Sequence, residues 1–309
     1  MSGWTYRVFG LDIRFPREVP TLRGVRIEPS RMPDVDVTFG PVPPRGTMET
    51  VNDDLDVAWH DGDLTIAVEE VGRFLVSAGR TLVVEPYPQV GPPEVDLYLT
   101  GSIMGAILHQ RAILPLHCNA FDCGGQAILL CGDSGAGKST LAAWFEARGY
   151  ALLTDDVCAI GVSSDGPPLG HPGMPRLRLW SDAIEAMGRS GQSAHAVPWT
   201  DDKFELEMDG RRARHGLPIA AIYHLTCTET DQPFAITPID GLAAIDAITS
   251  CIYRRRLGDL VGRTRGYLQD AVRLSRTTPV FRVSRTWGMH QFEEQSRFIE
   301  NHFKSKSSL

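Results

Sequence analysis

Short segments in which apolar and polar residues alternate fill the first hundred positions of the chain. Among them are YRVFGLDIRF, VDVTF, DLTIAVE, GRFLVSAG and TLVVEPY, and clusters of Gly, Pro and Asp separate the segments. Alternation with a period of two is typical of strands with one buried face. The pattern therefore predicts a β-rich layer. The Gly-Pro-Pro break at 91–93 indicates a β-rich N-terminal domain of residues 1–94 and a second domain of residues 95–309.

The apolar spacing changes after this break. Residues 95–113 predict a helix, and residues 113–160 follow the order strand, turn, strand, Gly-rich loop, helix, strand, which is typical of an α/β domain. Beyond 170 the pattern predicts strands at 176–180, 204–208, 219–225 and 280–285. It predicts helices at 181–188, 241–252, 257–276 and 291–303, and a frayed tail at 304–309.

Composition excludes several classes of protein. The chain has 309 residues, 42% of them hydrophobic, which is enough for a substantial core. No apolar run approaches the length of a membrane span, and the start MSGWTYRVFGLDIRF lacks the plan of a signal peptide, so we expect a soluble cytoplasmic protein. Six cysteines without a C-x-x-C pair favour free thiols over disulfides or a thiolate metal site. A net charge of −7 argues against nucleic-acid binding.

One segment fits the phosphate-binding pattern G-x-x-x-x-G-K-[ST], between the strand AILLC and the helix STLAAWFEARG. In such loops backbone amides and the positive end of the helix bind phosphates, the lysine contacts the β- and γ-phosphates, and the hydroxyl binds Mg²⁺. The alternative is a purely structural glycine turn. The predicted nucleotide-binding residues are Gly132, Asp133, Ser134, Gly135, Ala136, Gly137, Lys138, Ser139 and Thr140.

The residues before the loop predict a hairpin. Gly124 and Gly125 separate two strands, as in a two-residue turn. This register places Cys118 opposite Cys131, as packing residues, and brings His117 level with the start of the phosphate loop. His117 is therefore a candidate site residue, although a histidine at the end of a strand can be purely structural.

Two carboxylates follow the next strand. Gly149 ends the predicted helix, and YALLT then delivers Asp155 and Asp156 at its carboxyl end, where ligands bind in α/β sheets. One carboxylate would suit Mg²⁺ and the other would suit a base. The alternative is a pair of turn-forming residues.

These motifs together resemble a known family. The segment LHCNAFDCGGQAILLCGDSGAGKSTLAAWFEARGYALLTDDVCAI is similar to the catalytic segment of the HPr serine kinase/phosphorylase superfamily, in which the same motifs occur in this order and spacing. The resemblance implies a phosphoenolpyruvate-carboxykinase-like P-loop kinase core behind the N-terminal β-rich layer, in an α/β (α+β) protein. YRVFGLDIRF and PGMPRLRLWSDAIEAMG resemble more narrowly the HPr-kinase-like enzymes encoded with lasso-peptide biosynthesis.

The resemblance also implies residue roles. It makes Asp155 the base that takes the hydroxyl proton, Lys138 a catalytic contact to the phosphates, Asp156 a Mg²⁺ partner together with Ser139, and His117 a polar orienter. The reverse order of the two aspartates stays open. The implied activity is an ATP- and Mg²⁺-dependent kinase that acts on a serine hydroxyl of a precursor peptide, at its C-terminal residue.

Two other functions remain alternatives. One is an HPr-type protein serine kinase, although the glycine-rich glutamate signature of that enzyme is not found downstream of the aspartates. The other is a nucleotide-binding regulator without catalysis, which would have no need of the carboxylate pair.

Basic residues give the remaining candidates. Arg176 and Arg178 alternate on one face of a predicted strand, and with Lys203 they are candidates for contact with phosphate or a peptide carboxylate; solvated strand arginines are the alternative. Residues 254–285 hold nine arginines against two aspartates, a local charge of +7. This segment would bind an acidic partner or a second subunit, or be an ordinary exposed surface.

Overall fold

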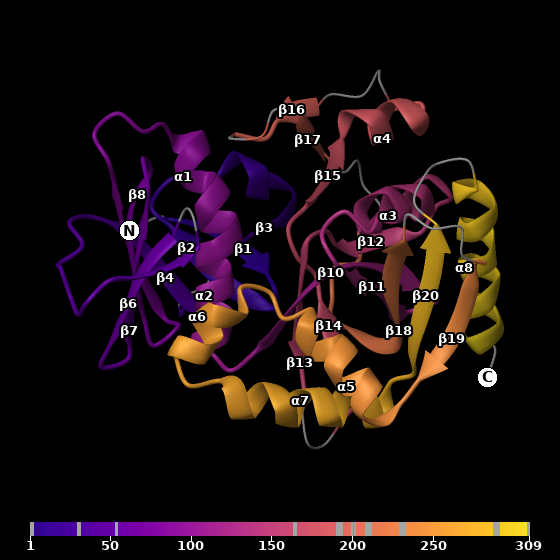
Figure 1. Ribbon diagram of the computed structural model, residues 1–309. Coiled ribbons are helices and arrows are strands. Elements are labelled where there is room, and N and C mark those ends of the chain that lie inside the picture. The colour runs from indigo at the N-terminus through magenta and orange to yellow at the C-terminus, as the bar shows by residue number, and fades with distance from the viewer. Residues whose placement is uncertain are drawn as a thin grey trace. The chain divides into compact units, whose positions relative to one another are not determined.

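The computed structural model, drawn in Figure 1, has a mixed α/β fold. It describes residues 3–29, 32–52, 55–162, 166–189, 194–198, 200, 202–207, 212–228, 233–286 and 291–307. The chain divides into two compact units. The first comprises Met1–Pro115 and Tyr253–Tyr267, and the second comprises Leu116–Ile252 and Leu268–Leu309.

The first unit contains the predicted β-rich layer as a nine-stranded sheet of order β3-β1-β2-β4-β9-β8-β7-β6-β5. In β2, Leu11, Ile13 and Phe15 are buried and the residues between them are half-buried, which confirms the period of two. The pattern did not predict β3, β5 or β6. The bounds are β1 Trp4–Val8, β2 Leu11–Phe15, β3 Arg26–Ile27, β4 Val35–Phe39, β5 Glu49–Asn52, β6 Leu55–His60, β7 Asp63–Val68, β8 Gly72–Ser77 and β9 Thr81–Pro86.

Helices complete the first unit. The helix predicted at 95–113 is present as α1 (Pro92–Tyr98), a π turn η2 (Leu99–Ile103) and α2 (Met104–Gln110). It lies in the same compact unit as the N-terminal sheet, and this unit extends to Pro115 in the first part of the chain. The other helices are η1 (Pro20–Val25) and α6 (Arg255–Leu260).

A buried histidine explains part of this grouping. His109 of α2 is completely buried, and its Nε2 lies 3.0 Å from the carbonyl oxygen of Tyr253. Its Nδ1 accepts a hydrogen bond from the hydroxyl of Tyr267. Both partners come from the later stretch 253–267, which is thereby held within the first unit.

The second unit is built on a sheet that contains the predicted hairpin. β10 and β11 pair antiparallel with Cys118 opposite Cys131, which confirms the predicted register. The other edge of β11 pairs parallel with β18, and β18 pairs parallel with β20. The bounds are β10 Leu114–Cys123, β11 Gln126–Gly132, β12 Ala151–Thr154, β13 Val157–Gly161, β14 Leu169–His171, β18 Leu217–Thr228, β19 Ala235–Ile239 and β20 Val280–Thr286.

A smaller sheet of order β15-β17-β16 lies beyond β14 in the sequence, with β15 Arg176–Trp180, β16 Ala194–Ala196 and β17 Lys203–Glu207. The helices of the second unit are α3 (Lys138–Ala147), α4 (Ser181–Ala186), α5 (Gly241–Ser250) and α8 (Phe292–Ser307), and α7 (Thr264–Thr277) enters it from the first unit. Aromatic packing joins α3 and α8 to the sheet: the rings of Phe121 and Phe145 stack at 4.4 Å, and Phe303 contacts both.

The structure differs from two of the predictions for the C-terminal part of the chain. The helix predicted at 257–276 is two helices, α6 and α7, because Gly262 adopts a left-handed conformation (φ 79°) between them. The tail predicted as frayed is helical as far as Ser307, where Lys304 pairs with Glu300 at 2.8 Å; residues 308 and 309 lie outside the described part. None of the described helices combines the length and the apolar character needed to cross a membrane.

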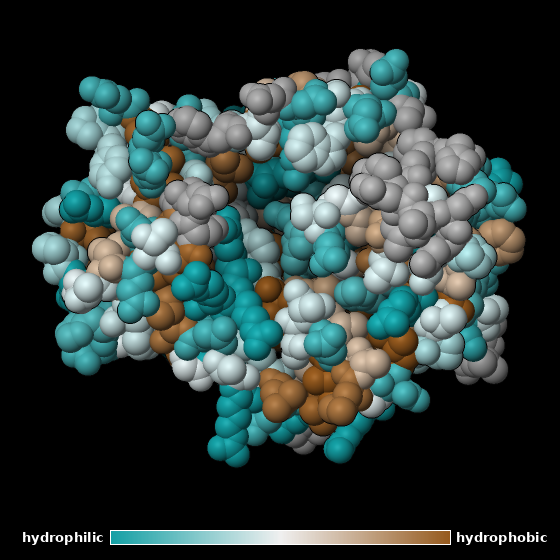
Figure 2. All heavy atoms as spheres, viewed as in Figure 1, coloured by the Kyte–Doolittle hydropathy of each residue, from teal (hydrophilic) through white to brown (hydrophobic). Residues whose placement is uncertain are grey.

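Hydrophobic side chains are exposed on the face shown in Figure 2, over α5 and α7. Leu242 of α5 is 84% exposed and Leu268 of α7 is 54% exposed.

Candidate functional site

The phosphate loop connects the end of β11 to the start of α3, as predicted. Gly132, Gly135 and Gly137 have φ values of 135°, 83° and 82°, a region that side chains disfavour. A Cβ at Gly132 would also collide with the carbonyl oxygen of Leu225 on β18. The glycines of the motif are thus required by the backbone path itself, and not only by the closeness of a ligand.

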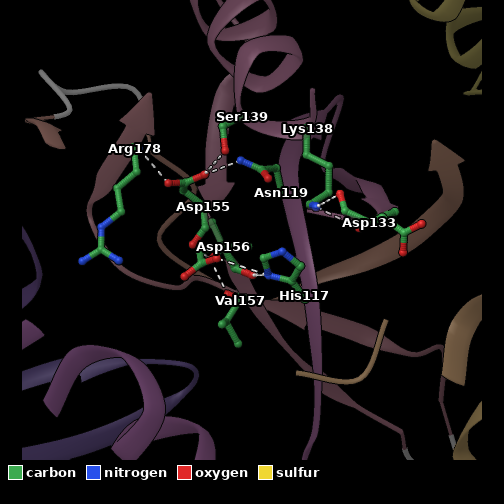
Figure 3. A network of polar contacts seen from close by, with 11 residues as sticks. His117, Asn119, Asp133, Lys138, Ser139, Asp155, Asp156, Val157 and Arg178 are labelled. Atoms are coloured by element: carbon green, nitrogen blue, oxygen red, sulfur yellow. Dashed lines mark hydrogen bonds and ion pairs between the residues drawn. The ribbon is translucent and has the colours of Figure 1, made fainter. Parts of the chain in front are cut away.

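Lys138 is buried at the first position of α3. Its Nζ donates hydrogen bonds of 2.8 Å to the carbonyl oxygens of Gly132 and Asp133 (Figure 3). Burial lowers the pKa of this amine. The ammonium therefore lies within the loop, held by carbonyls of the loop's own backbone.

Asp155 is the buried centre of the site, at the carboxyl end of β12. Its Oδ1 accepts hydrogen bonds from the Ser139 hydroxyl at 3.2 Å and from the side-chain amide of Asn119, and its Oδ2 accepts one of 2.8 Å from the backbone N–H of Arg178 (Figure 3). Burial, and then the charge of Asp156, raise the pKa of this carboxyl. The loop serine and the first aspartate are thus in direct contact.

Asp156 has a different backbone conformation and different contacts from Asp155. It has a left-handed backbone (φ 75°), which is unusual for a residue with a side chain. The Nδ1 of His117 lies 3.2 Å from Oδ1 of Asp156 and 2.9 Å from its carbonyl oxygen. Both partners are acceptors, so Nδ1 carries a proton. Burial alone would raise the pKa of Asp156, but the hydrogen bond and charge of His117, with Arg178 and Arg176, hold it below its usual range.

The predicted substrate residues lie on the small sheet. Arg176 and Arg178 project from β15 toward one carboxylate, Glu205 of β17, at 3.5 and 3.2 Å. Their side chains are only 4% and 11% exposed, so the alternative of solvated strand arginines is wrong. The Nζ of Lys203 lies 5.8 Å from the ring centre of Trp180, its partner in the strand register.

Two residues of this network were not predicted. Asn119 is buried and lies two positions after His117 on β10, on the same face of the strand, so the hairpin register that singled out the histidine could also have indicated the asparagine. Glu205 had no such signal, because its importance depends on the pairing of β15 with β17.

The residues present fit a Mg²⁺-nucleotide. The hydroxyl of Ser139 and the carboxylate of Asp155 are oxygen donors of the kind Mg²⁺ prefers, and they already lie side by side. In the described part of the chain, no group of three or more His, Cys, Asp or Glu side chains could hold a metal ion by itself. This donor set suits an ion that keeps most of its ligands from phosphates and water.

The arginine-rich segment 254–285 is distributed over the two compact units. Residues 254–265 lie in the first unit, where Arg256 donates to the carbonyl oxygen of Val51 at 3.0 Å and Arg255 faces Asp259 at 3.7 Å. Arg282 and Arg285 lie in the second unit on β20, the first exposed and the second buried.

Comparison with known proteins gives similarity to solved structures, and none to a protein-family model or a curated sequence. The structure is similar to that of the HPr(Ser) kinase/phosphatase from Coxiella burnetii, with 12% sequence identity and a TM-score of 0.32, over 62% of this chain and 98% of that one.

Proposed function

We propose that this protein is an ATP- and Mg²⁺-dependent kinase that transfers a phosphoryl group to a serine hydroxyl of a peptide. The observation that carries the proposal is the contact between the phosphate loop and the carboxylate pair: Ser139 Oγ lies 3.2 Å from Asp155 Oδ1, and Asp156 follows directly with His117 bound to it. Phosphoryl transfer depends mainly on positioning and on neutralising charge, and these groups can supply both.

Residues 132–140 would bind the phosphates through backbone amides and the start of α3. Lys138 would exchange the carbonyls of Gly132 and Asp133 for phosphate oxygens, because its flexible stem lets the ammonium turn toward them. Mg²⁺, when bound by Ser139 and a carboxylate, supplies neutralising charge for the transferring phosphoryl group.

The geometry supports the reverse of the aspartate order first expected. Asp155 contacts Ser139, the hydroxyl implied in Mg²⁺ binding, and three donors hold it in place. Asp156 contacts no loop residue among the described interactions, and His117 orients it. We therefore assign Asp155 to the metal and Asp156 to the serine hydroxyl proton, with His117 as the positioning residue.

The substrate would be a serine peptide that presents an anionic group. Arg176, Arg178 and Lys203 place three cations on the small sheet, and Arg178 is bonded through its backbone to Asp155. A carboxylate beside the reacting serine would suit these residues. The resemblance to lasso-associated kinases favours the C-terminal serine of a precursor peptide as this substrate.

The two other functions are less well supported. A regulator without catalysis would not need Asp156 and His117 oriented toward each other beside the loop. An HPr-type kinase is disfavoured by the missing glycine-rich glutamate signature. Its expected substrate is a folded carrier protein, which gives a direct test.

The deciding experiment incubates the full chain with ATP, Mg²⁺ and peptides that end in serine, and measures intact masses. We expect a phosphoryl adduct on the serine peptide, none on its alanine counterpart, and less on the same peptide with an amidated C-terminus. Phosphorylation of folded HPr with untouched peptides would replace the proposal by the HPr-type function. ATP binding without transfer to any acceptor would favour the regulator.

The roles of the aspartates are tested in the same assay. Asp156→Asn should keep ATP affinity and lose transfer by about 10²- to 10⁴-fold. Asp155→Asn should weaken the Mg²⁺-dependent part of ATP binding. Asp202→Asn, an exposed aspartate of the same unit, is the matched control. If Asp155→Asn left ATP binding intact while transfer was lost, the first order would be restored.

A further inference from the structure

Arg285 is a buried arginine at the carboxyl end of β20, and the mechanism above does not use it. Only 5% of the residue is exposed. It lies opposite Cys227 on β18, and β18 is the strand next to β11. Because β11, β18 and β20 run parallel, their carboxyl ends lie at one edge of the sheet, where the phosphate loop begins.

The guanidinium of Arg285 lies against the phosphate loop. Measured from the position of a Cβ built on Gly137, Nη1 is 3.3 Å away, Cζ 3.7 Å and Nη2 3.9 Å. The neighbouring Cys227 donates from Sγ to the carbonyl oxygen of Ala136 at 3.4 Å. The ends of β18 and β20 therefore contact the two residues directly before Lys138.

This charge has no counterion among the described residues. The Nε of Arg285 is buried without a hydrogen-bond partner, and the contact given for its guanidinium, besides the loop, is the ring of Phe292 at 5.5 Å. Burial lowers the pKa of Arg285, which expresses the cost of holding the charge there. An unpaired buried charge is strongly unfavourable unless something compensates it.

The other buried arginines of the second unit behave differently. Arg176 and Arg178 both face Glu205, and Arg189 pairs with Glu146. Among the arginines of this unit that are less than 10% exposed in the described part, Arg285 is the one without a carboxylate partner. The half-buried Arg212 also has no ion pair, but it donates to the carbonyl oxygen of Gly173. Arg285 is also the one that touches a loop built to bind anions.

We propose that Arg285 is a phosphate-binding residue of the nucleotide site, and that the polyphosphate chain of the nucleotide is its missing counterion. The inference rests on the proposed nucleotide site, but it does not depend on which acceptor receives the phosphoryl group. An arginine fork can contact two phosphate oxygens at once, which Lys138 cannot. The competing interpretation is a packing residue that fills the space beside Gly137 and Phe292.

The test compares Arg285→Gln and Arg285→Lys with Arg282→Gln, which removes an exposed arginine from the same strand. Calorimetry measures the Kd of Mg·ATP and of Mg·tripolyphosphate, and the Tm is measured without ligand. For Arg285→Gln we expect both Kd values to rise about 10- to 100-fold. The Kd values of Arg285→Lys should lie between those of Arg285→Gln and the wild type, and those of Arg282→Gln should match the wild type.

Stability separates the two interpretations. If the charge is uncompensated in the empty protein, Arg285→Gln has an unchanged or higher Tm without ligand. A clearly lower Tm, a failure to fold, or unchanged Kd values would each make Arg285 a packing residue and overturn the proposal. A weaker affinity for ATP with an unchanged affinity for tripolyphosphate would also overturn it, because the contact would then be with the nucleoside.

The outcomes also distinguish this inference from the proposed kinase function. If the wild type binds Mg·ATP and tripolyphosphate but phosphorylates no serine, the kinase proposal fails while the Arg285 comparison remains decisive. If serine is phosphorylated and Arg285→Gln binds both ligands normally, only the Arg285 proposal fails. A wild type that binds neither ligand overturns both.

Discussion

The Nδ1 of His117 lies within 3.2 Å of Oδ1 of Asp156, and this contact lowers the pKa of the carboxyl against the effect of burial. Removing the histidine takes away the largest interaction that opposes burial and leaves only the weaker charges of Arg178 and Arg176, so the pKa of Asp156 should rise. A base works only when it is deprotonated, and the acid limb of the kcat profile should therefore move to higher pH in His117→Leu. The measurement is kcat against pH with saturating ATP and peptide.

His117→Asn is the companion variant, because its amide can replace the Nδ1 donor. It should restore part of the wild-type profile. If His117→Leu lowered kcat equally at every pH, the histidine would have a structural role and Asp156 would not be the titrating base.

Lys138→Met should abolish most phosphoryl transfer. The methionine keeps much of the apolar stem but removes the ammonium that would contact the phosphates. We expect a loss in kcat/KM of at least about 100-fold, the scale of a lost electrostatic contact to a developing charge. Lys306→Met, at an exposed position of α8, is the control in the same peptide assay. Turnover close to the wild type in Lys138→Met would remove the loop from the mechanism.

Gly132→Ala should disrupt the loop even without nucleotide. The position has φ 135°, and a Cβ would meet the carbonyl oxygen of Leu225. We expect the free energy of unfolding to fall by about 2 kcal/mol or more, from backbone strain and the clash together. Urea titration measures this loss. Gly166→Ala, which would enter open space, should change little, and equal stability of the two variants would contradict the explanation.

Asn119→Leu should destabilise the protein and loosen Asp155. The amide of Asn119 donates to Oδ1 of this buried carboxyl, and loss of a hydrogen bond to a buried charge costs about 1–3 kcal/mol. Mg²⁺-dependent ATP binding should weaken as well, because the pKa of Asp155 rises further. Asn301→Leu, at an exposed position of α8, serves as the control. Normal stability together with normal Mg²⁺ dependence would show that the contact is dispensable.

His109 predicts an acid-labile first unit. Burial lowers its pKa from 6.5 to about 4, so the folded state keeps the ring neutral while the unfolded state takes up a proton near pH 6.5. The stability contributed by this group is therefore complete above pH 6.5 and is lost as the pH falls toward 4, by about 3 kcal/mol in all. Urea unfolding at a series of pH values from 7.5 to 4 measures how steeply the free energy of unfolding falls with pH. This pH dependence should become weaker in His109→Gln. It should persist in His60→Gln, which removes an exposed histidine.

Local sequence patterns were enough to predict much of the fold. A Gly-Gly turn determines the register of its hairpin, which is why Cys118 opposite Cys131 was predictable. Alternation also revealed most strands of the first unit. It failed for β19, where Pro238 interrupts the pattern, although an edge strand of this kind tolerates proline.

The site was predictable only where its residues are neighbours in sequence. The phosphate loop and the aspartate pair form short motifs, and His117 follows from the hairpin register. Glu205 and Arg285 join the site through strand pairing over long stretches of chain, and no local pattern marks them. Arg176 and Arg178 were open to an incorrect interpretation for the same reason, since their burial depends on β17.

The parallel pairing of β11 with β18 also bears on how the protein is made. The loop sequence is complete at Ser139, but β18, the parallel neighbour of β11, begins only at Leu217, and Arg285 follows still later. During synthesis the nascent chain must emerge at least as far as Arg285 before these pieces can meet, and such distant pairings form slowly. If residues 132–140 and Arg285 form the proposed nucleotide site, ATP would stabilise only chains that extend through β20, and a product truncated before β20 would carry the entire P-loop motif without that site.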